Sequence, residues 1–164
     1  MNVPLGLTAV LCLALLLTAA CADARPTPEP PPAALHAIRI GPAHARVRLA
    51  RTHAERRHGL MHVTELAADE GMLFVYREAN ARSIWMKSCR IALDVAFADA
   101  AGRVFQITTL QPPTETGGTV QEVRSRAAAP YVLEMPAGFF ARHRLGAGAQ
   151  LQLPAAAERA RADP

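Results

Sequence analysis

Apolar and polar positions alternate along the chain between residues 36 and 49. Apolar side chains stand at every second position on each side of Gly41-Pro42, and arginines fill several of the positions between them. A period of two residues is typical of strands that have one buried face. The pattern predicts two half-buried strands, with a break between them at Gly41 and Pro42.

A short helix is predicted directly after these strands. Thr52 and Glu55 have the spacing of a capping box, in which the side chain of each residue accepts a hydrogen bond from the backbone N–H of the other. Three basic residues follow at positions 56–58, where positive charge favours the end of a helix. Gly59 then supplies the left-handed backbone that ends it.

The rest of the patterned region indicates strands. Residues 84–98 form the longest strand-like segment, with an apolar face at odd positions from Ile91 to Phe97 and with Asp94 on the other face. Further strands are expected at residues 71–76, at 104–110 after a turn at 99–102, at 131–135 and near Leu151, and a helical turn starts at Phe139. No alternation of strands and helices is evident. We predict a mainly β fold, a sandwich or a partly open barrel, with one or two short helices and an N-terminal signal helix.

A long polar segment separates two of these strands. Residues 111–129 contain Pro112-Pro113 and Gly117-Gly118 and are longer than an ordinary connection. We expect this segment to be a functional flap or a mobile loop.

The beginning of the sequence predicts export. Residues 5–20 form an apolar run without a charge, shorter than the roughly twenty residues that span a membrane. The residues that end in Cys21 resemble a bacterial lipobox, which implies a signal peptide over residues 1–20 and acylation of the Cys21 thiol. Ordinary secretion with cleavage after Ala24 is the alternative. Both place the protein outside the cytoplasm, on the periplasmic face of a bacterial membrane as a lipoprotein or in the soluble periplasm.

One domain is expected after this leader. Residues 21–34 are rich in proline and predict a tether, residues 35–153 carry the strand patterns, and residues 154–164 predict a frayed helix or tail. Three cysteines exclude a disulfide scaffold. The net charge is +4, but the basic residues are scattered and few aromatic residues lie among them, so we expect no nucleic-acid partner.

Several stretches together resemble the DUF192 (UPF0127) family of uncharacterised domains. They are HGLM at residues 58–61, EGMLFVY at 70–76, SIWMKSCRIALDVAFAD at 83–99 and YVLEMPAGFF at 131–140, with a hairpin turn before Arg103. The resemblance implies a mainly β fold and no particular reaction. The chain departs from the family pattern at His58, Ser88-Cys89 and Ala92, where Arg, Asn-Thr and Pro are common.

Lys87 is the only lysine of the chain, and it lies two positions after the only tryptophan, Trp85. An ammonium is a compact point charge whose properties differ from those of a guanidinium. We expect Trp85 and Lys87 to line the mouth of a cleft that takes an anionic group, such as a carboxylate or phosphate. A surface lysine without a role is the alternative interpretation.

Asp94 and Glu134 are the candidate carboxylates. In an unbroken strand Asp94 points away from Lys87, and a bulge near residues 88–90 would bring the two together. Asp94 has an alternative structural role, in which it accepts hydrogen bonds from backbone N–H groups at a strand end or turn. Glu134 is expected on the face opposite Tyr131, either in the same cluster or, preferably, as an exposed strand residue.

Other chemistry is expected to be absent. Cys89 is interpreted as a small buried residue rather than a nucleophile. His58 and His62 are four residues apart, but Gly59 ends the helix between them, so we predict no metal site. No fingerprint of a dinucleotide or phosphate loop is present, and we predict no cofactor.

Three functions are compatible with these features. The first is an exported, lipid-anchored binding domain for an anionic small molecule, with the membrane reached through its anchor. The second is an envelope enzyme, a hydrolase or transferase, that uses Lys87 or Asp94 as acid or base. The third is a structural or interaction protein of the cell envelope.

Overall fold

A computed structural model describes residues 34–162. The predicted signal helix, the lipidation site at Cys21 and almost all of the predicted tether lie outside these residues. The described part contains nine strands and three short helices, which confirms the mainly β fold class. Among residues 34–162, no helix has the length and apolar character needed to cross a bilayer.

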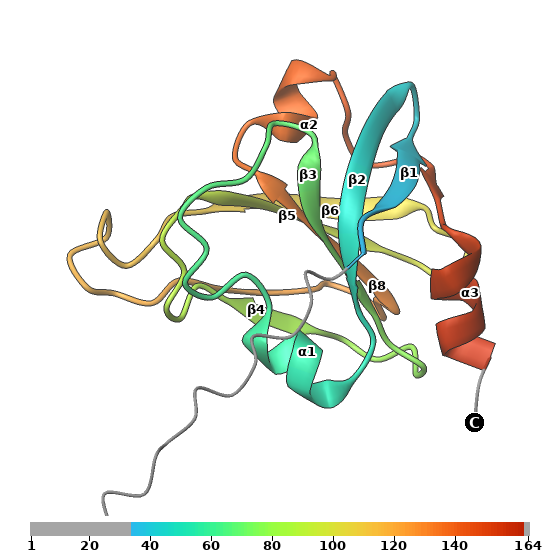
Figure 1. Ribbon diagram of the computed structural model, residues 1–164, viewed down its shortest axis with the longest axis horizontal. Helices are drawn as coiled ribbons and strands as arrows, with labels where there is room; N and C mark the ends of the chain where they lie inside the picture. Colours follow the sequence, from blue (N-terminus) through green and yellow to red (C-terminus); the bar gives the residue numbers. More distant parts are fainter. Residues whose placement is uncertain (1–33, 163–164) are drawn as a thin grey trace, which may run out of the picture. The chain divides into compact units, whose positions relative to one another are not determined.

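Seven strands form one sheet and two form a separate ribbon (Figure 1). The sheet runs in the order β6-β5-β8-β3-β2-β1-β9, and β4 pairs with β7. The strands are β1 (His36–Ile40), β2 (Ala43–Ala50), β3 (Glu70–Val75), β4 (Ser83–Trp85), β5 (Leu93–Ala98), β6 (Val104–Leu110), β7 (Glu122–Arg124), β8 (Tyr131–Pro136) and β9 (Leu151–Gln152). The helices are α1 (His53–His58), α2 (Phe139–Arg142) and α3 (Ala155–Ala162).

The sheet curls until its two edges approach each other at one end. An isolated bridge joins Arg103, before β6, to Gln150, before β9. The backbone N–H of Val104 also donates to the carbonyl of Ala149 at 2.9 Å. A curled sheet whose edges meet over only part of their length is a partly open barrel, one of the two architectures that the sequence predicted, and not a sandwich.

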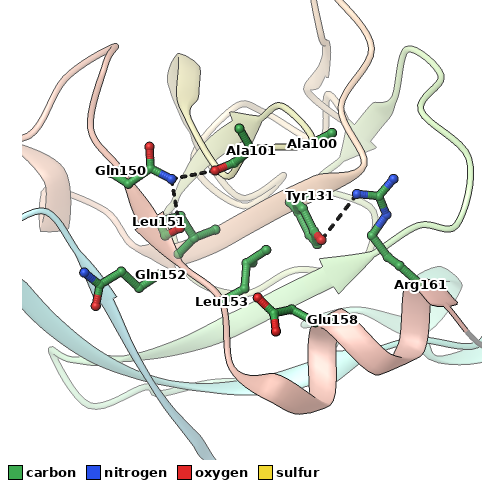
Figure 2. Close-up of a pocket in the computed structure, with 9 residues that line it drawn as sticks. All are labelled: Ala100, Ala101, Tyr131, Gln150, Leu151, Gln152, Leu153, Glu158 and Arg161. Atoms are coloured by element: carbon green, nitrogen blue, oxygen red, sulfur yellow. Dashed lines mark hydrogen bonds between the residues drawn. The ribbon is translucent and has the colours of Figure 1, made fainter.

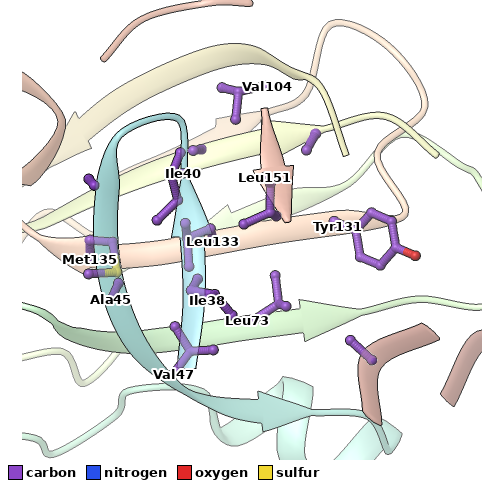
Figure 3. Packing of buried hydrophobic residues seen from close by; sticks show 14 of the residues in the cluster. Ile38, Ile40, Ala45, Val47, Leu73, Val104, Tyr131, Leu133, Met135 and Leu151 are labelled. Carbon is purple, nitrogen blue, oxygen red and sulfur yellow. The ribbon is translucent and has the colours of Figure 1, made fainter. Parts of the chain in front are cut away.

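Both faces of the central strands are buried. In β8, the side chains of Tyr131, Leu133 and Met135 pack into one apolar cluster with residues of β1, β2 and β9 (Figure 3). Val132 belongs to a second cluster, on the opposite face, with residues of β3, β4 and β5. We call these the inner and the outer face of the sheet. The outer face is covered by the β4–β7 ribbon and by the chain that follows α1.

The predicted strand over residues 84–98 is broken, and this corrects the sequence interpretation. β4 ends at Trp85 and β5 begins at Leu93, in different sheets. Between them the chain turns, with Ser88 at a φ of +57°. The apolar character is continuous across the turn because Met86 and Cys89 are buried in the outer cluster, so hydrophobicity alone did not reveal the break.

Three further features differ from the sequence interpretation or add to it. β2 and β3 are parallel and are joined through α1, an arrangement that the strand pattern did not indicate. The polar segment 111–129 contains β7, which pairs with β4 through Ile84 and Val123. The segment expected as a frayed helix or tail forms α3, where Ala157 is fully buried against the inner cluster.

Candidate functional site

Trp85 and Lys87 lie close together at the surface. Trp85 ends β4 and is 46% exposed. Lys87 is also exposed, and its Nζ lies 5.6 Å from the centroid of the indole ring. This distance is within the range of a cation–π contact, which is weak at an exposed position.

Asp94 is not part of this group. It is buried on β5, where its carboxylate accepts a hydrogen bond from Thr109 Oγ1 at 2.7 Å and from the backbone N–H of Phe140 at 3.3 Å. The second bond satisfies an N–H in the first turn of α2, where the cap residue Gly138 offers no side chain. The geometry is that of the structural interpretation of Asp94, and the predicted clustering of Asp94 with Lys87 is not observed.

Glu134 lies on the outer face of β8, opposite Val95 of β5. It is only 5% exposed, so the preferred expectation of an exposed strand residue was wrong. Its place on the face opposite Tyr131 and Leu133 agrees with the sequence pattern. Burial follows from the covering of the outer face by the ribbon and α1, contacts that no local pattern reports.

Glu134 lines a narrow hollow of about 50 Å³, which we call the Glu134 hollow. Trp85 lines the same hollow, together with residues of α1, of the chain after it and of the end of β3. Its walls also include Arg56, Arg57, His58, Gly59, Leu60, Met61, Phe74, Tyr76, Ser83, Ile84 and Cys89. The helix α1 and the strand β4 thus close over the same part of the sheet (Figure 1).

The hollow is a poor environment for charge. Burial raises the pKa of Glu134 to about 8. Burial, with a smaller contribution from the nearby Glu134, raises the pKa of the Cys89 thiol to about 11. The pKa of the Tyr76 phenol is also raised, chiefly by burial. At neutral pH the groups at the base of the hollow are therefore mostly uncharged.

Helix α1 places the basic residues at the mouth of this hollow. The capping box predicted from the sequence is present, since Thr52 Oγ1 accepts from the N–H of Glu55 at 3.1 Å and Glu55 accepts from the N–H of Thr52 at 2.8 Å. Gly59 ends the helix at a φ of +51°. A Cβ at this position would lie 3.3 Å from the Phe74 ring, so glycine also permits the close approach of the chain to β3.

A larger hollow of about 610 Å³ adjoins the first and shares Arg56 and Tyr76 with it. We call it the arginine hollow. Its remaining lining residues are Arg51, Arg77, Glu78, Arg82 and Arg161, so five guanidinium groups face a single carboxylate. The sequence did not predict this site because these arginines are separated by up to about a hundred positions and show no local cluster.

The ring of Tyr76 contacts two guanidinium groups of the arginine hollow. The guanidinium carbon of Arg82 lies 3.9 Å from the centroid of its ring, and that of Arg56 lies 4.8 Å away. Burial lowers the pKa of Arg82, and the positive charge of Arg56 lowers it further. Arg56 also donates to the carbonyl of Val75 at 3.0 Å, which fixes its position beside the ring.

Part of this guanidinium surface has no internal partner. The Nε atoms of Arg82 and Arg161 are buried and have no hydrogen-bond partner among residues 34–162. Buried N–H donors are nearly always paired, with protein, water or a ligand. The two Nε–H groups and the repulsion between Arg82 and Arg56 together favour an anion in the arginine hollow.

A third hollow, of about 650 Å³, lies between β9 and α3 (Figure 2). Three of its polar side chains, those of Gln150, Tyr131 and Arg161, already make hydrogen bonds within the fold. Gln150 donates to the carbonyl of Ala101 at 2.6 Å, and Arg161 donates to the Tyr131 hydroxyl at 3.4 Å. Size alone therefore does not make this hollow the best candidate for a site.

No metal centre is evident in the described part of the chain. Residues 34–162 include no group of three or more His, Cys, Asp or Glu side chains placed to hold a metal ion. The rings of His58 and His62, the pair considered from their spacing, lie 6.4 Å apart between centroids.

The sequence stretches that carry the family resemblance meet at the Glu134 hollow. Its walls take residues from all four of them: 58–61, 70–76, 83–99 and 131–140. Stretches up to about seventy positions apart thus share one surface, and this convergence marks the hollow as the feature that these motifs build.

Comparison with known proteins identifies the family. Residues 36–153 match the family DUF192, described as "Uncharacterized ACR". Among solved structures, a Sinorhizobium meliloti 1021 protein described as a "putative transcription regulator" has a TM-score of 0.66 and 30% identity, covering 73% of this chain and 94% of its own. A protein of unknown function from Novosphingobium aromaticivorans DSM 12444 has a TM-score of 0.66 and 27% identity, covering 73% and 85%. None of the curated proteins matches. With most of its length matched, the chain belongs to the DUF192 family.

Proposed function

We propose that this chain is a small binding domain for an anionic molecule, and that the arginine hollow holds the anionic group. The observation that carries this proposal is that five guanidinium groups line one hollow with Tyr76, and that two buried Nε–H groups among them have no partner within residues 34–162. Guanidinium groups match carboxylate and phosphate oxygens in geometry and charge. The site differs in position from the cleft expected at Trp85, Lys87 and Asp94, while the class of ligand is the same.

Calorimetric titration of the full chain with inorganic phosphate tests this proposal. Mild detergent is added because residues 5–20 are strongly apolar. We expect Arg82→Gln to weaken phosphate binding about tenfold or more, because a hydrogen bond to a charged group contributes about 1.5–3 kcal/mol. Arg103→Gln is the matched control, since Arg103 is exposed and does not line the hollow.

Two results would refute the arginine hollow as the site. One is the absence of phosphate binding in the unchanged chain at millimolar concentration. The other is equal affinity in the Arg82→Gln and Arg103→Gln variants when their melting temperatures show that both are folded.

The second part of the proposal is that the domain is exported and lipid-anchored through Cys21. Its support is the apolar run at residues 5–20 and the lipobox-like order that ends in Cys21. Metabolic labelling with palmitate in a bacterial host is expected to mark the unchanged chain and to fail in Cys21→Ser. A mature N-terminus at Arg25 would instead indicate secretion without an anchor.

A further inference from the structure

The Glu134 hollow contains a hydrogen-bonding group that the fold leaves unused. No hydrogen bond or ion pair within residues 34–162 involves the Glu134 carboxyl, although the residue is only 5% exposed. It lines the hollow together with Phe74 and Cys89 of the outer cluster. The carboxyl oxygens are not among the fully buried atoms that lack a partner, and Glu134 lines the hollow, so a ligand group in the hollow can reach them.

Burial determines the protonation state in which Glu134 binds a ligand. Burial raises its pKa to about 8, so at neutral pH the carboxyl is mostly protonated and offers one O–H donor. The titratable side chains that share the base of the hollow, Tyr76 from the end of β3 and Cys89 from the turn after β4, both have raised pKa values and stay neutral. The base of the hollow therefore presents a neutral donor.

The mouth of the hollow selects the charge of what enters. Arg56, Arg57 and His58 of α1 all line it, and the described structure brings no second carboxylate there. A ligand ammonium would have to pass these positive groups, whereas a carboxylate is attracted by them. The volume of about 50 Å³ has room for a few atoms of the size of a water molecule, which fits the three heavy atoms of a carboxylate.

We propose that the Glu134 hollow is a carboxylate-binding subsite, in which the protonated side chain of Glu134 donates a hydrogen bond to the carboxylate of the ligand. The inference rests on the proposed function, because the rest of the ligand then lies across Tyr76 in the adjoining arginine hollow. The substrate class is a small dianion with a carboxylate at one end, such as a dicarboxylate. No covalent bond changes, and one proton is held between two carboxyl groups.

This arrangement makes binding depend on pH in a defined direction. Below pH 8 the free protein already carries the proton, so the affinity does not depend on the titration of Glu134. Above pH 8 the carboxyl is ionised in the free protein, and binding must take up one proton, which lowers the affinity about tenfold for each pH unit. A ligand bound through an ammonium would show the opposite slope.

The test is calorimetric titration of the full chain with glutarate between pH 6.5 and 9.5. We expect the affinity of the unchanged chain to fall above pH 8, with proton uptake detected as a dependence of the heat on the buffer. Glu134→Gln keeps an N–H donor of the same size and is expected to bind with a flat profile. Glu134→Leu removes the donor and is expected to weaken binding at pH 7 about tenfold.

The controls separate this inference from the proposed function. Glu115→Gln changes an exposed loop glutamate and should keep the pH profile of the unchanged chain. His58→Gln removes the imidazole that lines the hollow and should also keep that profile. If phosphate binding depends on Arg82 but glutarate affinity is the same in Glu134→Leu and the unchanged chain, the carboxylate subsite is refuted and the arginine hollow stands. An affinity that rises with pH, or the same fall in Glu134→Gln, also refutes it. If neither phosphate nor glutarate binds, both proposals fail.

Discussion

Asp94 and Glu134 lie on adjacent strands, one position apart in register, with their side chains on opposite faces of the sheet. Across β5 and β8, Asp94 pairs with Met135 and Val95 pairs with Glu134. Asp94 accepts hydrogen bonds from Thr109 and Phe140, whereas Glu134 lines a hollow without a partner among the described residues. The two carboxyl groups are similarly buried but lie in different surroundings. Asp94 binds groups within the fold, and Glu134 lines the Glu134 hollow.

Asp94→Ala is expected to destabilise the domain by about 3 kcal/mol. The change leaves the N–H of Phe140 without an acceptor and the Thr109 hydroxyl without its partner, at a site where Asp94 is 3% exposed. Urea unfolding followed by circular dichroism measures the effect. Thr109→Val removes one of the two bonds and serves as the intermediate case, with a smaller loss. Equal stability of Asp94→Ala and the unchanged chain would contradict this role.

Gly71→Ala is expected to destabilise the domain by about 3 kcal/mol or more. A Cβ at position 71 would overlap the carbonyl oxygen of Glu134 and lie 2.5 Å from Met135 Sδ. Overpacking of this kind pushes β3 away from β8. Gly146→Ala is the matched control, because nothing lies within 4 Å of its added Cβ. Thermal unfolding of both variants checks the prediction, and similar melting temperatures would refute it.

Glu134→Gln is expected to change how stability depends on pH. The folded-state pKa of about 8 lies above the usual value of 4.5. The folded protein favours the protonated form of Glu134. The contribution of this proton to the free energy of unfolding is therefore complete below pH 4.5 and is lost as the pH rises through 8. The loss is on the order of 1.4 kcal/mol per pKa unit. Urea unfolding at pH 5, 7 and 9 should show that the free energy of unfolding of the unchanged chain declines as the pH rises. In the Glu134→Gln variant this decline should be several kcal/mol smaller. Parallel declines would mean that Glu134 is not buried in solution.

Cys89 is expected to react slowly with alkylating reagents in the folded chain. Its thiol is buried, and a pKa of about 11 leaves about one molecule in ten thousand as thiolate at pH 7. The rate with iodoacetamide should be at least about a hundredfold lower than for an exposed cysteine. The measurement uses a chain with serine at positions 12 and 21, so that only Cys89 reacts, and urea supplies the unfolded reference. A similar rate with and without urea would contradict the burial of this thiol.

Local patterns predicted the elements that depend on neighbouring residues. The capping box at Thr52 and Glu55, the break at Gly41 and Pro42, and the alternation along β8 are all present. Each of these rests on interactions within a few positions of the chain, or on the two-residue period of a strand. The family resemblance was also readable, since its motifs are contiguous.

The candidate site depended on contacts that such patterns do not contain. The turn after Trp85 is as apolar as a strand because Met86 and Cys89 are buried beneath the ribbon. The predicted grouping of Lys87 with Asp94 required a bulge within one strand, whereas the structure divides that segment between two sheets. The polarity of Glu134 suggested exposure, while the covering of the outer face by α1 and β4 buries it.

The sequence by itself determined that the chain forms a mainly β domain with a capped helix before its third strand, because backbone geometry links residue spacing directly to strands and caps. Only the tertiary structure decided which charged side chains line the same hollow. Arg51, Arg82 and Arg161 line one hollow with Tyr76 because strand order and the curl of the sheet bring distant segments together. Pairing between distant strands is selected by the burial of whole faces, and no window of neighbouring residues contains that information.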